Sequence, residues 1–242
     1  MTHMTLFQTE RYTARLADGP ADIEHCKALR RRCFGTDDTD GFDQICQHVL
    51  VEDRTGALVC CFRLLALAQG RDIGQSYAAQ FYELTALMSI GRPMVEIGRF
   101  CTNPAYSDLD ILRVAWAAMA RFVDDAQAEL LFGCSSFAGT DAGRYRETFA
   151  LLHARHLAPA NWQPQVKAPE IVHFSQHKPD MKQALRAMPP LLRSYLAMGG
   201  WVSDHAVMDH QLGTLHVFTG LEISAIPARR AKALRAAVNT PG

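Results

Sequence analysis

The sequence lacks a long apolar run and any recognisable export signal. Its densest apolar stretch, Val114–Ala120, is seven residues long, far short of the roughly 18 that a membrane-spanning helix needs. The first residues, Met1–Phe7, do not combine a basic segment with an apolar one, so they do not predict a signal peptide. We therefore expect a cytoplasmic protein.

There is also no excess of charge of one sign, because lysine plus arginine and aspartate plus glutamate are 25 each. This balance argues against a general nucleic-acid-binding protein. Residues 1–141 nevertheless hold 13 basic and 19 acidic side chains, whereas residues 142–242 hold 12 and 6. The basic final third predicts a docking surface for an acidic protein partner or an anionic membrane, with scattered solvated charge as the alternative. The residues concerned are Lys178, Lys182, Arg186, Arg193, Arg229, Arg230, Lys232 and Arg235.

Nothing in the cysteine or histidine spacing is typical of a metal site. All seven cysteines lie in the first 134 residues and no C-x-x-C motif occurs, so we expect buried, reduced thiols. His153 and His156 lie three apart without an evident third ligand, and no metal site is predicted.

What the chain does have is an apolar content of 48% over 242 residues, enough for a sizeable core. Strands and helices alternate in its middle, which predicts one α/β domain over 1–242 with a mixed sheet flanked by helices. The core spans about 20–225 and a basic terminal helix follows at 226–242. After a loose start, the expected elements are helix 22–34, a hairpin of strands 49–51 and 58–65, a short helix 78–83, strand 94–101, helix 108–125, strand 130–136, a helix from 140 that ends before 159, an irregular stretch 158–169, strand 171–174, helix 190–198, strand 215–223 and helix 227–238.

Several charged side chains fall where this pattern expects core. Arg63 lies in the middle of an apolar strand, where an unpaired guanidinium would cost several kcal/mol. Taken singly, each of these residues fits a snorkelling arginine, a solvated loop or a strand edge, but together they predict a polar site. The set comprises Arg30, Asp40, Asp43, Arg63, Glu96 and Arg99.

The motifs that contain these residues resemble those of known enzymes. Arg30-x-x-x-Phe34, Asp40-x-Phe42-Asp43, Phe62-Arg63-Leu64-Leu65 and Glu96-x-x-Arg99 are similar to the motifs of acyl-homoserine lactone synthases. A fuller resemblance, from Leu29 to about Val217, is to L-ornithine Nα-acyltransferases, which begin ornithine lipid synthesis. It is found in the segments 42–48, 96–106, 131–141 and 189–201. The sequence departs from that family near Gly213-Thr214, where Asn-Thr is usual.

This resemblance implies a GNAT-like fold, in which a splayed central strand admits the pantetheine arm of the donor. It also implies transfer of a 3-hydroxyacyl chain from acyl carrier protein to the α-amine of an amino acid, with L-ornithine as the expected acceptor, giving a lyso-lipid. Acyl-phosphopantetheine on the carrier is then the donor, and no resident cofactor is expected. The alternatives are an autoinducer synthase that uses S-adenosylmethionine and a non-catalytic module that senses acyl carrier protein or lipid.

The candidate residues are suited to this chemistry. An α-ammonium group must lose a proton before it attacks a thioester, and Glu96 is our candidate for the base. Arg63 and Arg99 can bind carboxylates in bidentate fashion, while Asp40 and Asp43 suit a cationic amine.

The resemblance assigns further residues to substrate binding. It places Arg30 and Phe34 at the site, and the backbone N–H groups of Phe100, Cys101 and Thr102 as contacts of the oxyanion and the pantetheine. Ser135 and Ser136 are also expected to contact substrate. They lack the Gly-x-Ser-x-Gly context of a nucleophile elbow, which argues against covalent catalysis.

Two local features carry further expectations. GNAT enzymes that use coenzyme A bind its diphosphate with a glycine-rich turn, but the segment Tyr106–Leu112 has no glycine and two aspartates, so acyl carrier protein is favoured as donor. Glu96 and Arg99 would face opposite sides of a regular strand. If both serve one site, an irregular residue must lie between them, and Gly98 is the expected one because it tolerates positive φ.

Overall fold

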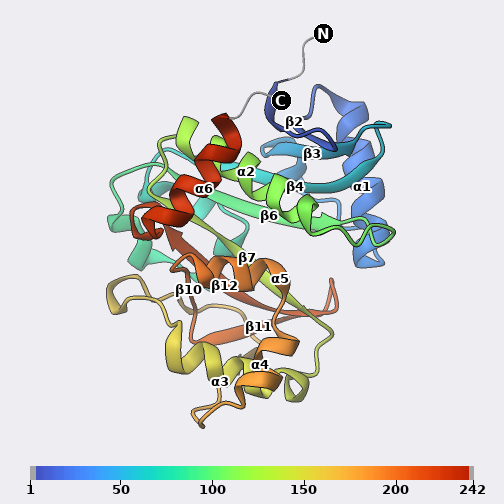
Figure 1. The fold of residues 1–242 in the computed structure, drawn as a ribbon. Coiled ribbons are helices and arrows are strands. Elements are labelled where there is room, and N and C mark those ends of the chain that lie inside the picture. Colours follow the sequence, from blue (N-terminus) through green and yellow to red (C-terminus); the bar gives the residue numbers. More distant parts are fainter. Residues whose placement is uncertain (1–3, 240–242) are drawn as a thin grey trace. The chain divides into compact units, whose positions relative to one another are not determined.

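The computed structural model describes residues 4–239 and divides the chain into two compact units (Figure 1). The first unit takes the chain up to Ala66, Val95–Ala128 and the stretch from Pro227 onward. The second takes Leu67–Met94 and Glu129–Ile226. The expectation of one domain stays a prediction. Within residues 4–239, no helix is long and apolar enough to cross a membrane.

The sheet of the first unit runs in the order β1-β2-β3-β4-β6. Its strands are β1 (Thr5–Gln8), β2 (Tyr12–Leu16), β3 (Gln47–Asp53), β4 (Leu58–Leu67) and β6 (Met94–Thr102). β3 and β4 form the predicted antiparallel hairpin, and its turn uses Gly56 with φ 81°, a conformation that favours glycine. The expectation of a loose start was wrong, because β1 and β2 also form an antiparallel hairpin. These strands are too short for an alternating pattern to stand out.

Among the described residues, three α-helices belong to this unit, and the sequence predicted all of them. Helix α1 (Pro20–Phe34) packs Cys26 and Leu29 against Leu50 and Cys61 of the sheet. Asp108 caps helix α2 (Leu109–Asp125) by accepting a hydrogen bond from the backbone N–H of Asp110. Helix α6 (Ala228–Asn239) lies beside α2 (Figure 1).

In the second unit, β7 (Leu130–Ala138) and β12 (Thr214–Glu222) are antiparallel partners over their whole length. The sheet continues from β12 to β11 (His205–Asp209) and β9 (Ile171–His173), and β10 (Trp201–Val202) also pairs with β12. The sequence did not predict β10 and β11. A separate pair joins β5 (Tyr82–Glu83) to β8 (Gln165–Val166).

The helices of the second unit are short. Helices α3 (Arg146–Arg155), α4 (Met181–Ala187) and α5 (Pro190–Ala197) supply Phe149, Ala184 and Leu192 to one apolar core. The predicted helix at 78–83 is wrong: a 3₁₀ turn at Ala78–Gln80 leads into β5 instead. Other 3₁₀ turns in this unit are Gly70–Gln75, Thr85–Ser89, Ala142–Tyr145, Ala160–Trp162 and Ile223–Ala225.

Candidate active site

The first unit holds a buried network of arginines and aspartates, and Arg30 of α1 is its deepest member. Its side chain is 1% exposed. Nε donates to both carboxylate oxygens of Asp38, at 3.0 and 2.9 Å, and the two Nη atoms donate to Asp43 at 2.5 and 3.2 Å. Arg30 therefore fixes the loop that follows α1 at two points.

The segment from Asp38 to Asp43 contains a turn that carries the carboxylates of Asp40 and Asp43. A 3₁₀ turn, η1 (Gly41–Gln44), begins after Asp40, whose side chain accepts a hydrogen bond from the Phe42 N–H at 3.0 Å. In return, Asp43 accepts one from the Asp40 N–H at 3.4 Å. This reciprocal arrangement is a capping box. The D-x-F-D spacing thus sets the geometry of both acidic groups.

Arg63 reaches the same turn from the middle of β4. Its Nη1 donates to Asp40 at 2.5 Å and to Asp43 at 2.9 Å, while Nη2 donates to Asp40 at 3.1 Å. The guanidinium also lies over the ring of Phe42, 5.7 Å from its centroid. Its Nε is buried and has no hydrogen-bond partner among the described residues. Arg63 therefore brings one spare donor to the site.

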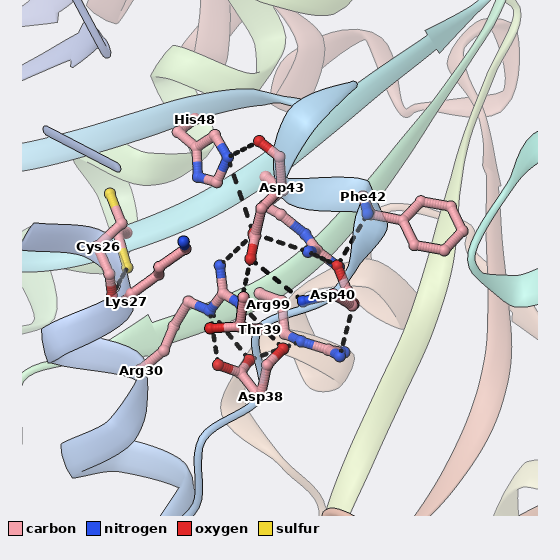
Figure 2. Close-up of polar contacts among 12 residues, drawn as sticks. Cys26, Lys27, Arg30, Asp38, Thr39, Asp40, Phe42, Asp43, His48 and Arg99 are labelled. Atoms are coloured by element: carbon pink, nitrogen blue, oxygen red, sulfur yellow. Dashed lines mark hydrogen bonds and ion pairs between the residues drawn. The ribbon is translucent and has the colours of Figure 1, made fainter. Parts of the chain in front are cut away.

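Arg99 of β6 completes the network (Figure 2). Its Nε lies 2.6 Å from Asp38 and its Nη2 donates to Asp40 at 3.0 Å. The strand is irregular here, but the expectation about Gly98 was wrong: Arg99 itself has φ 53°, whereas Gly98 lies outside the left-handed region. This conformation costs a side-chain-bearing residue about 1–3 kcal/mol, and two ion pairs with carboxylates offset it.

The charges of the network balance, with three arginines facing three aspartates. Burial alone would raise the pKa of Asp43, but the hydrogen bonds and charge of Arg30, and then of Arg63, hold it well below its usual range. The side chain of Asp40 is 24% exposed, whereas those of Asp38 and Arg63 are 1% and 2% exposed. Asp40 is therefore the member most open to a ligand.

Glu96 lies on β6 and is only 4% exposed. Its negative charge interacts electrostatically with the thiol of Cys46, and so do the charges of Arg63 and Asp40. Burial, aided by Glu96, raises the pKa of Cys46 to about 11, although Arg63 opposes this. Glu96 thus belongs to the same electrostatic environment as the network.

The remaining candidates of the first unit lie on α1 and β6. Phe34 packs at the end of α1 beside the core that holds Leu29 and Leu50. Phe100 stacks on Phe62 with ring centroids 5.7 Å apart. Cys101 is buried against Cys61, and Thr102 is exposed.

The two serine candidates belong to the second unit. Both lie on β7; Ser135 is buried and accepts a hydrogen bond from the Thr219 hydroxyl at 3.0 Å, while Ser136 is exposed. Their role in binding substrate stays a prediction. Among the described residues, no group of three or more histidine, cysteine or acidic side chains is placed to hold a metal ion.

Sequence reasoning missed two members of the site, Asp38 and His48. Asp38 lies in an acidic stretch whose polar sequence predicts a solvated loop, yet it is 1% exposed. His48 of β3 is the cross-strand neighbour of Arg63 and lies 3.1 Å from the carbonyl oxygen of Asp43 through its Nε2. No signal in the sequence pointed to either residue, because the three predicted arginines were already matched by the three predicted carboxylates Asp40, Asp43 and Glu96.

Comparison with known proteins identifies the fold. Residues 24–117 match the family model described as an acetyltransferase (GNAT) domain. The fold is similar to that of an N-acyl amino acid synthase from uncultured soil microbes, with a TM-score of 0.52, 11% identity and coverage of 88% of this chain and 92% of that one. The expected α/β, GNAT-like fold is thereby confirmed.

Similarity in sequence is closer. The L-ornithine Nα-acyltransferase of Rhodobacter capsulatus is 32% identical over 236 residues, covering 89% of this chain and 91% of that protein. The enzyme of the same name from Brucella abortus is 30% identical over 245 residues, covering 89% and 85%. This chain is an N-acyltransferase and belongs to the L-ornithine Nα-acyltransferase family.

Proposed function

We propose that this enzyme transfers a 3-hydroxyacyl chain from acyl carrier protein to the α-amine of L-ornithine, producing lyso-ornithine lipid. The observation that carries the proposal is the buried network of Arg30, Asp43, Arg63, Asp40 and Arg99, with Glu96 on the same strand as Arg99. Family membership supports the acceptor, and the residues of the site supply the chemistry.

Glu96 acts as the base in this scheme. It removes a proton from the α-ammonium group, directly or through a water molecule, and the free amine then attacks the thioester carbonyl carbon. The carbonyl oxygen carries the negative charge of the tetrahedral intermediate, which backbone N–H groups at 100–102 are suited to stabilise. Collapse breaks the carbon–sulfur bond, and the pantetheine thiolate leaves and takes up a proton.

Arg63 is suited to hold the α-carboxylate of the acceptor. Its Nε is a buried N–H without a partner among the described residues, and leaving such a donor unsatisfied costs about 1–3 kcal/mol. Gly98 lies beside it, since a Cβ built there would be 3.9 Å from this nitrogen. The absent side chain of Gly98 leaves room for a carboxylate oxygen.

Asp40 is suited to hold the δ-ammonium of ornithine. It is the most exposed carboxylate of the network, and its charge is shared between Arg63 and Arg99. Asp43 is less available, because Arg30 and Arg63 occupy its oxygens. Of the two acidic residues that the sequence suggested for a cationic amine, Asp40 is the better candidate.

The start of α2 supports acyl carrier protein as the donor. The Asp108 carboxylate caps this helix, accepts a hydrogen bond from Tyr12 at 2.7 Å and pairs with Arg11 at 2.5 Å. A carboxylate at the helix N-terminus occupies the position that would otherwise attract the diphosphate of coenzyme A. Turnover of purified enzyme with acyl-coenzyme A as fast as with the carrier-bound chain would contradict this assignment.

The predicted basic docking surface falls on both units. Lys178, Lys182, Arg186 and Arg193 are exposed in the second unit, and Arg229, Arg230 and Lys232 are exposed in the first, while the side chain of Arg235 lies outside the described residues. On α4, Lys182 and Arg186 lie four apart beside Leu185, which is 41% exposed. Basic side chains around an apolar one suit an acidic carrier protein. The lyso-lipid product also suits peripheral contact with the cytoplasmic face of an anionic membrane.

The test is an assay with acyl carrier substrate and a radiolabelled acceptor, followed by lipid extraction. We expect labelled lyso-lipid with ornithine and much less with glutamine, lysine or glycine. A lactone formed from labelled S-adenosylmethionine would identify an autoinducer synthase. No product with any acceptor would identify a non-catalytic module.

A further inference from the structure

A buried histidine contacts the arginine–aspartate network from β3, a strand that contributes none of the arginines or aspartates of the network. This residue is His48, and its side chain is 2% exposed. Its Nε2 lies 3.1 Å from the backbone carbonyl oxygen of Asp43 (Figure 2). The catalytic scheme above gives this imidazole no role.

The backbone of His48 is held from both sides. It is the register partner of Arg63 on β4, and its carbonyl oxygen accepts a hydrogen bond from the backbone N–H of Ala17 at 2.8 Å. Directly opposed residues of an antiparallel pair place their side chains on the same face of the sheet. The imidazole therefore projects beside Arg63 from a position that the sheet determines and the aspartate loop does not.

The contact completes the hydrogen bonding of the η1 turn. The backbone N–H of Asp43 donates to the carbonyl oxygen of Asp40. Those of Ile45 and Cys46 donate to the carbonyl oxygen of Phe42. The chain then enters β3, so the turn ends before the residue whose N–H would reach the carbonyl oxygen of Asp43 in a continuing helix. The imidazole supplies that donor from the neighbouring strand.

An ion pair between His48 and the carboxylate of Asp43 is the rival interpretation, because Nε2 lies 3.8 Å from Oδ1. That carboxylate oxygen already accepts hydrogen bonds from Arg30 at 2.5 Å and from Arg63 at 2.9 Å. The shorter contact of Nε2 is to the carbonyl oxygen, which can only accept a hydrogen bond. The geometry therefore favours a hydrogen bond from a neutral imidazole whose proton is on Nε2.

We propose that His48 is a positioning residue for acceptor binding, and that it acts by holding the carbonyl oxygen of Asp43 with its Nε2–H. The inference rests on the proposed function, which assigns the δ-ammonium of the acceptor to Asp40. Asp40 and Asp43 form the reciprocal capping box of η1, so a shift in the backbone of Asp43 also moves the Asp40 carboxylate. The contacts assigned to the acyl donor lie on β6, so the effect falls on the acceptor.

The test compares His48→Gln with His48→Asn. The amide nitrogen of glutamine takes a position close to that of Nε2, whereas the asparagine side chain is one methylene shorter and does not reach the carbonyl oxygen. Both replacements are neutral and carry the same amide group, so they differ mainly in whether this hydrogen bond forms. His25→Asn, at an exposed position of α1, controls for the loss of a histidine as such.

We expect His48→Asn to raise KM for ornithine roughly tenfold, the effect of about one lost hydrogen bond, while kcat and KM for the acyl donor change by less than about twofold. His48→Gln should return KM for ornithine close to the wild-type value, and His25→Asn should equal wild type. Equal KM for ornithine in the two His48 variants would overturn the proposal. An equal rise in KM for acceptor and donor would also overturn it, because that result indicates a general structural effect.

The tautomer of His48 gives a readout that does not depend on which amine is acylated. Nitrogen NMR of wild-type protein with isotope-labelled histidine distinguishes Nδ1 from Nε2, and the spectrum of His48→Gln assigns the signal. We expect a neutral ring with its proton on Nε2. A proton on Nδ1 alone would overturn the proposal.

The two proposals fail in different ways. If wild-type enzyme acylates another amino acid and not ornithine, the proposed function is wrong, and the same pair of variants assayed with that acceptor still tests His48. If ornithine is acylated but KM does not separate His48→Asn from His48→Gln, only the role of His48 is wrong. Absence of turnover with any acceptor would remove both.

Discussion

The guanidinium Nε of Arg99 lies 2.6 Å from the carboxylate of Asp38, and both side chains are at least nine-tenths buried. Asp38 belongs to the loop after α1, and Arg99 belongs to β6. Because Arg30 holds the same carboxylate from the other side, this loop is fixed between helix and strand. The contact positions the following turn, which carries Asp40 and Asp43.

Asp38→Asn should therefore destabilise the protein. Removing this charge leaves Arg30 and Arg99 each with one carboxylate partner fewer, and breaking a buried ion pair typically costs about 3–5 kcal/mol. The measurement is urea unfolding followed by circular dichroism. Asp37→Asn is the matched control: Asp37 is adjacent but exposed, and its carboxylate accepts hydrogen bonds from the backbone N–H and the hydroxyl of Thr39. Equal midpoints for the two variants would contradict the structural role of Asp38.

Gly98→Ala should weaken acceptor binding without unfolding the protein. The backbone of Gly98 lies outside the left-handed region, and a Cβ there meets only Arg63 Nε, at 3.9 Å. The methyl group would fill the space assigned to the substrate carboxylate, so KM for ornithine should rise roughly tenfold, a loss of about 1.4 kcal/mol. Gly91→Ala, with open space around its Cβ, should leave KM unchanged. An unchanged KM in Gly98→Ala would remove this assignment of Arg63.

Glu96→Gln should keep the fold and lower turnover by roughly 10²–10⁴, the usual contribution of a positioned base. The two side chains have the same shape, so KM for the acyl donor should change little. Steady-state kinetics with a thermal unfolding curve separates catalysis from folding. Glu24→Gln, an exposed glutamate on α1, serves as the control. Normal turnover in Glu96→Gln would refute the base assignment.

Stability should fall in acid because of Asp43. Its pKa in the folded state lies below the value of about 3.9 expected in the unfolded chain. As pH falls, the unfolded chain therefore binds the proton first, so this contribution is complete above about pH 5 and is lost progressively below it. Urea midpoints measured from neutral pH to about pH 3 should show this decline. The slope should be shallower in Asp43→Asn but unchanged in Asp125→Asn, at an exposed site.

Reversing the charge of Lys182 and Arg186 should weaken use of the carrier-bound donor. Each basic residue near an acidic surface contributes on the order of 1 kcal/mol, and salt screens the interaction. We expect Lys182→Glu/Arg186→Glu to raise KM for acyl carrier substrate, and wild-type activity to fall with ionic strength. Arg229→Glu/Arg230→Glu on α6 tests the first unit in the same assay. Activity that is independent of salt in all three proteins would argue against a docking surface.

The sequence alone determined the helices α1 and α2 and the strands β3, β4 and β6, and it singled out most of the charged positions of the candidate site. Helix α2 could be predicted because its apolar positions recur at helical spacing and Asp108 caps it. The charged positions Arg30, Arg63, Glu96 and Arg99 stood out because a buried charge is costly and needs a reason. Their motifs were also sufficient to recognise the family.

Only the tertiary structure decided which arginine pairs with which aspartate. Asp38 reads as solvated loop in the sequence, and its burial depends on arginines contributed by α1 and β6. The left-handed residue is Arg99, not Gly98, because ion pairs to Asp38 and Asp40 offset a strain that local propensity assigns to glycine. The contact between the sulfurs of Cys61 and Cys101 has the same origin. Contacts between residues distant in the chain follow from how helix and strands pack, and local sequence preferences do not encode them.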